Sequence, residues 1–190
     1  MPEKSSHFKH FLDRSLSHVV RWSSKPQHFH ESVVDHSFYV AYFTAILCYF
    51  LREIDEPIDE TKAIKMALVH DMEEIFSGDI LGPFKHHDEE VLTAIRKAGE
   101  ERISKAFEEL PKGLSEEFVS LWKENLRHKT KEALVVKLAD DLSLVTKCWE
   151  ETRVGNEFFR GTYEKHVKKL HELDYPWWQK IKDKVLPPLA

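Results

Sequence analysis

The sequence is poor in cysteine, and its two cysteines are far apart. The 190 residues include only Cys48 and Cys148, and both lie in apolar helical patterns. A disulfide framework or a cysteine-based metal site therefore has little support. Free cysteines of this kind suit a reducing compartment, so we expect a cytoplasmic protein.

An excess of positive charge is also missing. The chain has 28 Lys and Arg against 33 Asp and Glu, which gives a formal net charge of −5. Nucleic acids are bound largely through Lys and Arg at the backbone phosphates, so we expect no nucleic acid polymer as a partner. A small anionic substrate would need a locally positive site, such as a metal ion or a single Arg.

No apolar run reaches the length of a membrane span. The N-terminal MPEKSSHFKHF lacks the apolar stretch of a signal peptide. The longest apolar run is FYVAYFTAILCYFL at 38–51, which only Thr44 interrupts. A membrane-spanning helix needs roughly 20 apolar residues. We therefore expect a buried core helix at this place and no membrane association.

Strand patterns, internal repeats and low-complexity segments are absent as well. Apolar residues recur at helical spacing throughout the chain. Ser32 and Asp35 have the spacing of a capping box, which opens a long helix. A further helix is expected over 60–77, and the segment DILGPFK at 79–85 is expected to be a loop because glycine and proline interrupt the pattern.

The expected architecture is one all-α domain over 1–190, a bundle of about seven or eight helices. With 42% hydrophobic residues the chain can build a proper core. The informative motifs lie between residues 21 and 151. The C-terminal helices, expected over 156–186, would pack onto the part that carries these motifs.

Polar side chains stand in apolar helical patterns at three places. His36 lies in the first turn of the long helix, the pair His70–Asp71 lies in VHDMEEIFSGD, and Asp140 lies within LVVKLADDLSLVTKC. An unpaired buried carboxylate costs several kcal/mol, roughly, so it normally has a cation beside it. Each of these residues alone has an ordinary explanation, such as an ion pair with Lys or Arg, or a hydrogen-bonded core histidine.

The combination of these four residues predicts a metal site. Two imidazoles and two carboxylates suit Mn, Fe, Co, Ni or Zn better than a soft metal or calcium. An octahedral ion would keep open positions for water and a substrate oxygen, as metal-assisted hydrolysis requires. Glu74 follows His70 by one helical turn, where it could accept a proton from that water. The second ring nitrogen of a histidine ligand usually hydrogen-bonds a carboxylate or a carbonyl, and Asp141 or Glu73 could serve there.

This pattern resembles the HD-domain superfamily of metal-dependent phosphohydrolases, and within it the bacterial HD-domain 5′-deoxynucleotidase family. The likeness rests on four blocks that follow one another in the family's order. They are RW at 21–22, ESVVDHS at 31–37, VHDMEEIFSGDILGPFKH at 69–86 and VKLADDLSLVTKCWEE at 136–151.

The resemblance implies a catalytic role for each matching residue. One divalent metal ion (Co, Mn, Ni, Fe or Zn, with Mg possible) would be held by His36, His70, Asp71 and Asp140. Glu74 would position or deprotonate the attacking water. Arg21 would orient the substrate phosphate. Asp79 would contact the sugar hydroxyl or assist the leaving 5′-oxygen.

The resemblance also implies how a nucleotide would be bound. Trp22 would lie against the sugar, where the family distinguishes deoxyribose from ribose. The full set of implied substrate contacts is Arg21, Trp22, Asp71, Asp79, Ile80, Leu81, Gly82 and Asp140. The family often has Pro-Thr where this chain has Leu81 and Gly82, so a hydroxyl contact is missing here.

The implied activity is hydrolysis of nucleoside 5′-monophosphates, preferably 2′-deoxy ones, to nucleoside and phosphate by a homodimer. Three alternatives remain open. The first is another hydrolase that cleaves nucleoside triphosphates or phosphodiesters. A triphosphate would need several cations around the pocket, and the sequence indicates only Arg21 and Lys85. The second is a nucleotide-binding regulatory module without catalysis, and the third is a structural domain with internal ion pairs.

Overall fold

The computed structural model describes residues 7–85 and 87–188, and it confirms the all-α class. Within these ranges there is no β-strand, only an isolated antiparallel bridge between Val20 and Ser32. The helical segments are α1 (Phe8–Leu12), a 3₁₀ turn η1 (Ser15–His18), α2 (Val33–Glu53), α3 (Glu60–Val69), α4 (Glu74–Ser77), α5 (Gly82–Lys85), α6 (Glu89–Ala106), α7 (Lys112–Arg127), α8 (Lys131–Arg153), a 3₁₀ turn η2 (Glu157–Phe159), α9 (Arg160–Glu172) and α10 (Pro176–Val185). Seven of these described helices, namely α2, α3 and α6 to α10, have ten residues or more.

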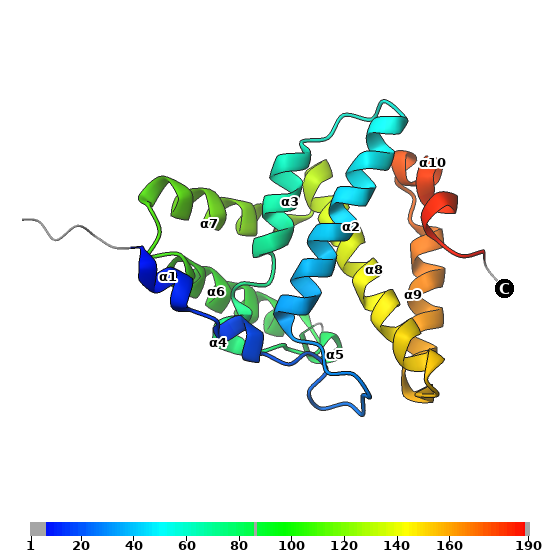
Figure 1. Cartoon of the computed structure of the whole chain (residues 1–190), viewed down its shortest axis with the longest axis horizontal. Coiled ribbons are helices and arrows are strands. Elements are labelled where there is room, and N and C mark those ends of the chain that lie inside the picture. Colours follow the sequence, from blue (N-terminus) through cyan, green and yellow to red (C-terminus); the bar gives the residue numbers. More distant parts are fainter. Residues whose placement is uncertain (1–6, 86, 189–190) are drawn as a thin grey trace, which may run out of the picture.

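Helices α2, α3 and α8 pack against one another at the centre of the molecule (Figure 1). Helices α6 and α7 lie on one side of this centre, and α9 and α10 lie on the other (Figure 1). One continuous hydrophobic core joins these layers. Its fully buried members include Leu47, Met66, Trp122, Leu138, Leu170 and Trp178.

The two long central helices begin at side-chain caps. At α2 the expected capping box is present: the Ser32 hydroxyl accepts from the Asp35 N–H, and the Asp35 carboxylate accepts from the Ser32 N–H at 2.9 Å. At α8 the Thr130 hydroxyl accepts from the Ala133 N–H. Such caps satisfy N–H groups that have no partner inside the helix. They fix where each helix starts, and therefore which of its residues reach the centre.

The helix expected over 60–77 is divided, and this expectation was wrong. Helix α3 ends at Val69, a tight turn follows, and α4 begins at Glu74. In the turn the backbone bonds run to the third residue back, for example from the Glu74 N–H to the Asp71 carbonyl at 3.0 Å. The expected loop at 79–85 is also partly helical, because it contains α5.

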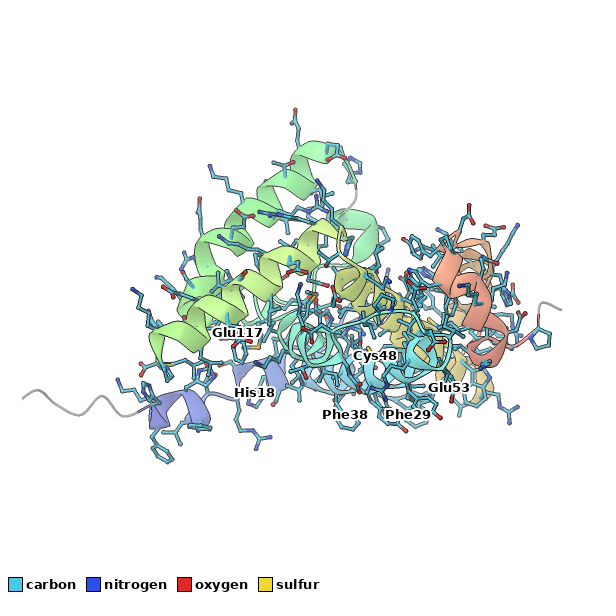
Figure 2. The ribbon with its side chains drawn as sticks, turned by 90° about the horizontal axis from the view of Figure 1, so that it is seen from above. His18, Phe29, Phe38, Cys48, Glu53 and Glu117 are labelled. Atoms are coloured by element: carbon cyan, nitrogen blue, oxygen red, sulfur yellow. The ribbon has the colours of Figure 1, made fainter. Side chains whose placement is uncertain are left out.

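Helix α2 is less buried than expected. An 18-residue window of it is long and apolar enough to cross a membrane by length and composition alone, and only 39% of that window is buried. Its inner side carries buried His36, Ser37 and Thr44, whereas Phe38 is 63% exposed. Figure 2 shows Phe38 at the outer edge of the molecule, on the same side as Phe29. The inner side of α2 therefore belongs to the core, and the outer side presents aromatic rings.

Candidate active site

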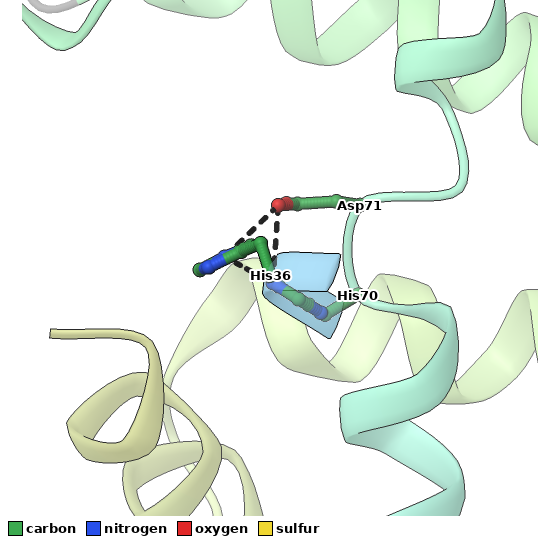
Figure 3. A group of neighbouring side chains, drawn as sticks. All are labelled: His36, His70 and Asp71. Atoms are coloured by element: carbon green, nitrogen blue, oxygen red, sulfur yellow. Dashed lines mark hydrogen bonds and ion pairs between the residues drawn. The ribbon is translucent and has the colours of Figure 1, made fainter. Parts of the chain in front are cut away.

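Three of the four predicted metal ligands, His36, His70 and Asp71, converge on one point (Figure 3). The fourth, Asp140, lies beside them. His36 Nε2 lies 3.3 Å from His70 Nε2 and 3.5 Å from Asp71 Oδ2. His70 Nε2 lies 3.1 Å from Asp71 Oδ2. Asp140 Oδ1 lies 3.2 Å from His36 Nε2. Helices α2 and α8 and the turn after α3 thus bring together residues that are far apart in the sequence.

These spacings fit the ligands of one divalent metal ion. Nitrogen and oxygen atoms that bind one ion at about 2.0–2.2 Å lie about 2.8–3.6 Å apart in octahedral or tetrahedral geometry. The measured separations fall within this range. Both imidazoles are buried, and each carboxylate is only partly accessible. The donor set therefore suits a divalent ion such as Zn, Mn, Co, Ni or Fe.

The second ring nitrogens of the two histidines contact a backbone carbonyl and a hydroxyl rather than Asp141 or Glu73. His70 Nδ1 lies 2.7 Å from the Ala67 carbonyl oxygen, which can only accept, so Nδ1 carries the hydrogen. The lone pair for a metal then resides on Nε2, which faces the cluster. His36 Nδ1 lies 2.9 Å from the Ser143 hydroxyl. The alternatives raised by the sequence, Asp141 and Glu73, were wrong.

Charges around the cluster favour a bound cation. Burial would lower the pKa of His70, but the neighbouring Asp71 carboxylate outweighs this effect and raises it to about 9. Burial, followed by the charges of Asp71 and Asp79, raises the pKa of Glu74 to about 10. Glu74 is buried, and its Oε2 has no hydrogen-bond partner among the described residues. A positive charge at the cluster would replace the proton on His70 and lower the pKa of Glu74.

The two adjacent aspartates of α8 share one lysine. Lys137 Nζ lies 2.7 Å from Asp140 Oδ2 and 3.0 Å from Asp141 Oδ1. Asp141 also accepts from Lys169 of α9 at 3.0 Å. Burial opposes ionisation of Asp140, but Lys137 and His36 outweigh it and hold its pKa well below the usual range. Asp140 therefore faces the cluster as a carboxylate, while Asp141 ties α8 to α9.

Arg21 reaches the site through the segment that precedes α2. The Arg21 N–H donates to the Glu31 carbonyl at 2.9 Å, next to the bridge that joins Val20 to Ser32. The buried Arg21 guanidinium also donates to Glu31 Oε2 at 2.9 Å. Burial alone would lower its pKa, but Glu31 and then Asp140, Asp71 and Asp79 raise it. The Arg21 guanidinium is thus close enough to interact electrostatically with the carboxylates of the cluster. Glu31 already accepts one of its hydrogen bonds.

The family resemblance places Trp22 against the sugar, and Asp79 at the sugar hydroxyl or the leaving 5′-oxygen. In the structure these two residues are hydrogen-bonded to each other. The Trp22 N–H donates to Asp79 Oδ2 at 2.9 Å. Trp22 has a φ of 58°, which is uncommon for a residue with a large side chain, and such strain is often found at functional sites. Its indole packs edge-on against Phe159, with 5.5 Å between the ring centroids. The contact with Asp79 brings the segment before α2 against the chain after α4.

The loop of Ile80, Leu81 and Gly82, which the family resemblance assigns to the nucleoside pocket, only partly lines a cavity. A cavity of about 380 Å³ lies between this loop and α6, and Ile80, Phe76 and Ile95 form apolar parts of its wall. Glu74 lies in the same wall. Leu81 and Gly82 do not belong to this wall, and Gly82 begins α5.

Comparison with known proteins identifies the family of this chain. The family model described as 5′-deoxynucleotidase YfbR-like matches residues 7–189. The chain belongs to the YfbR-like 5′-deoxynucleotidase family. The resemblance found in the four sequence blocks is thereby confirmed, and the chain is a hydrolase of this family.

Individual relatives agree with this YfbR-like assignment. A 5′-deoxynucleotidase of Photorhabdus laumondii is 28% identical over 180 residues, which cover 93% of this chain and 90% of that protein. A 5′-deoxynucleotidase of Yersinia pestis is 31% identical over 176 residues, 90% of this chain and 88% of that protein. The crystal structure of an HD-domain phosphohydrolase from Listeria innocua has a TM-score of 0.79 at 22% identity, covering 94% of this chain and 85% of that one, and supports the fold.

The sequence missed the residues that anchor the Arg21–Trp22 segment of this YfbR-like chain. The fully buried carboxylate of Glu151 on α8 accepts hydrogen bonds from the N–H groups of His28 and Phe29 and from the side chains of Lys147 and Asn156. Lys147 also donates to the Phe29 carbonyl. A Lys and a Glu four residues apart in an apolar pattern were the available signal.

Replacing Glu151 by Gln is expected to destabilise the fold strongly at neutral pH. Lys147, which is only 4% exposed, would lose its carboxylate partner, and breaking a buried pair costs about 3–5 kcal/mol. Burial opposes ionisation, but the His28 N–H and the other donors lower the pKa of Glu151 to about 2. The contribution of Glu151 to the free energy of unfolding is therefore present above the ordinary carboxyl pKa and is lost as the pH falls towards 2.

Urea unfolding of the wild type and Glu151→Gln at pH 7 and near pH 3 measures this contribution. The difference in unfolding free energy should be large at pH 7 and shrink at the lower pH. Glu150→Gln, the same change at the exposed neighbouring residue, should leave stability nearly unchanged at both values. An equal difference at both pH values would contradict the role of the Glu151 carboxylate.

Proposed function

We propose that this chain hydrolyses 2′-deoxynucleoside 5′-monophosphates to the nucleoside and orthophosphate, with one divalent metal ion. The single observation that carries the proposal is the geometry of the His36, His70 and Asp71 cluster within a chain of the 5′-deoxynucleotidase family. The His70 Nε2 lone pair faces the cluster, and the adjacent carboxylates supply the negative charge that a divalent ion needs.

His36, His70, Asp71 and Asp140 would hold the ion. When bound, the ion supplies positive charge for the transition state and makes the attacking water more acidic. The mixed nitrogen and oxygen set fits Co, Mn, Ni, Fe or Zn, and Mg is possible. The spacing of the donor atoms supports this assignment.

Other residues would act on the substrate directly. Glu74 would accept the proton of the attacking water, because its carboxyl is buried beside Asp71 and its Oε2 has no other partner among the described residues. Arg21 would orient the phosphate group. As the P–O5′ bond breaks, Asp79 would lie near the leaving 5′-oxygen, and Trp22 would lie against the deoxyribose. The bond between Trp22 and Asp79 supports a shared place for these two residues.

The nucleoside would contact the chain after α4. Ile80 lines a cavity whose wall combines apolar side chains with charged ones such as Glu74 and Arg102. Its apolar part would suit a base, which supports the assignment of Ile80. The places of Leu81 and Gly82 in the nucleoside pocket follow from the family resemblance, as do the substrate contacts of Asp71 and Asp140.

We also propose a cytoplasmic homodimer in which residues 1–190 form one domain. The continuous core from α2 to α10 supports the single domain. The exposed aromatic side of α2, with Phe38, Tyr39 and Tyr42, supports a protein interface, since such rings are enriched where subunits meet.

The test is metal-dependent release of orthophosphate from a panel of deoxynucleoside and ribonucleoside 5′-monophosphates and deoxynucleoside triphosphates. We expect release from the deoxynucleoside monophosphates with added Co, Mn or Zn, little from their ribose counterparts, and none in EDTA. Tripolyphosphate released from the triphosphates would contradict the proposal in favour of the triphosphohydrolase alternative. Bound metal without turnover of any nucleotide would instead favour a regulatory module.

A further inference from the structure

A second cavity adjoins the cluster on the side of α6 and α8. Its volume is about 190 Å³, and His70, Asp71 and Asp140 form part of its wall. At about 30 Å³ per molecule it has room for about six waters, which is sufficient for a phosphate group. Three of the four predicted metal ligands thus line a cavity to which the family resemblance assigns no function.

Cations from three separate elements line the same cavity. Lys85 ends α5, Arg96 lies on α6, and Lys137 lies on α8. Neither Lys85 nor Arg96 forms an ion pair with any carboxylate of the described residues, although acidic residues outnumber basic ones in this chain. His128 also lines the cavity, and its Nδ1 is buried without a hydrogen-bond partner in the described part of the chain. The wall also holds the carboxylates of Asp71, Glu73 and Asp140, and Lys137 is paired with Asp140. With Asp71 and Asp140 binding a metal ion, the unpaired charges of Lys85 and Arg96 would be available to an anion in the cavity.

We propose that Lys85, Arg96 and Lys137 form a phosphate subsite, which holds the phosphate group of the substrate and the orthophosphate product beside the metal ligands. This inference rests on the proposed function. Lysine binds phosphate as a compact point charge, and the planar fork of arginine can bind two phosphate oxygens at once. Lys137 donates to Asp140, so a phosphate bound by Lys137 would lie next to the ligand set.

The position of this subsite suits the phosphate group of a nucleotide, given the state of Arg21 and the neighbouring cavity. Arg21, the phosphate-orienting residue implied by the sequence, donates to Glu31 and is only 8% exposed, which leaves it less free to neutralise a phosphate dianion. The phosphate cavity and the cavity lined by Ile80 share Glu73 and Lys85 in their walls. A molecule with phosphate at one end and a base at the other would fit such a pair of adjoining spaces.

The experiment measures binding of orthophosphate to the Co²⁺-loaded full-length protein by calorimetry. In Arg96→Gln and in Lys85→Met, the Kd for orthophosphate should rise about tenfold or more, because each change removes a charge-assisted contact. The control is Lys97→Gln, the same loss of charge at the next residue of α6, which does not line the cavity. Its Kd for orthophosphate should equal that of the wild type, and binding of deoxyadenosine should be the same in the wild type, Arg96→Gln and Lys97→Gln, because neither Arg96 nor Lys97 lines the cavity that holds Ile80.

Equal orthophosphate affinity in the wild type and both cavity variants would overturn the subsite, and so would binding of tripolyphosphate but not orthophosphate. The same variants should raise KM for a deoxynucleoside monophosphate more than they change kcat. If the wild type hydrolyses the monophosphate and the variants bind orthophosphate unchanged, the subsite fails and the proposed function stands. If orthophosphate binding depends on Arg96 and Lys85 but no nucleotide is hydrolysed, the subsite stands and the proposed function fails.

Discussion

Asp71→Ala is expected to remove the metal and the activity together. Asp71 Oδ2 lies within 3.5 Å of both imidazole Nε2 atoms, so this change deletes the carboxylate that closes the cluster. Loss of an outer-shell partner alone typically costs 10–100-fold in metal affinity, so loss of a ligand should cost more, roughly a thousandfold. Phosphate release should fall by about the same factor or more, because the charge that neutralises the phosphate is lost.

Metal content after dialysis, together with phosphate release, measures this effect. Asp183→Ala is a suitable control, because Asp183 is an exposed carboxylate of α10, distant from the cluster in the sequence and without an ion pair among the described residues. It should keep one metal ion per chain and full activity. Retention of one tightly bound metal ion by Asp71→Ala would remove Asp71 from the ligand set.

Those parts of the fold that depend on local signals could be predicted from the sequence. The capping box of Ser32 and Asp35 acts within a single turn, so its spacing alone places the start of α2. His36 and Asp140 stood out because each interrupts an apolar helical pattern, where an unpartnered polar group is costly. The family resemblance then joined these isolated positions into one predicted ligand set.

The break after α3 could not be predicted, because tertiary contacts produce it. VHDMEEIF has a helical pattern, and its turn is held by the Glu73 carboxylate, which accepts from the Trp122 indole N–H at 2.6 Å across 49 residues of sequence. In a continuous helix His70 and Asp71 would diverge by about 100°. The turn lets both side chains face the same point.

The cations of the second cavity were hidden for a similar reason. Arg96 belongs to a helix whose charged residues are typical of a solvated face, and Lys85 follows a segment expected to be a loop. Only the packing of α6 on α5 and α7 brings them to the cluster. Gly99 contributes to this packing, since a Cβ there would meet the Trp122 ring at 3.1 Å.

Glu74→Gln is expected to keep the metal and lose most of the turnover. The amide has nearly the shape of the carboxyl group but cannot accept the proton of the attacking water. General base catalysis typically contributes 10²–10⁴-fold, so kcat should fall by roughly that factor while KM changes little. Metal content and steady-state kinetics of the same preparation separate the two effects, because Glu74 is not among the predicted ligands.

Glu73→Gln is the matched control, because it makes the same chemical change one residue earlier. Burial and the charge of Asp71 raise the pKa of Glu73 to about 7, which by itself would suit a general base better than the value of about 10 at Glu74. The hydrogen bond from Trp122, however, commits Glu73 Oε2 to the turn, whereas Glu74 Oε2 has no partner among the described residues. A bound divalent cation would lower the pKa of Glu74 towards the working range, since Asp71 is a main cause of its rise. We therefore expect Glu73→Gln to retain most of the wild-type kcat. If Glu73→Gln lost its turnover while Glu74→Gln kept full activity, the general base would be Glu73 instead.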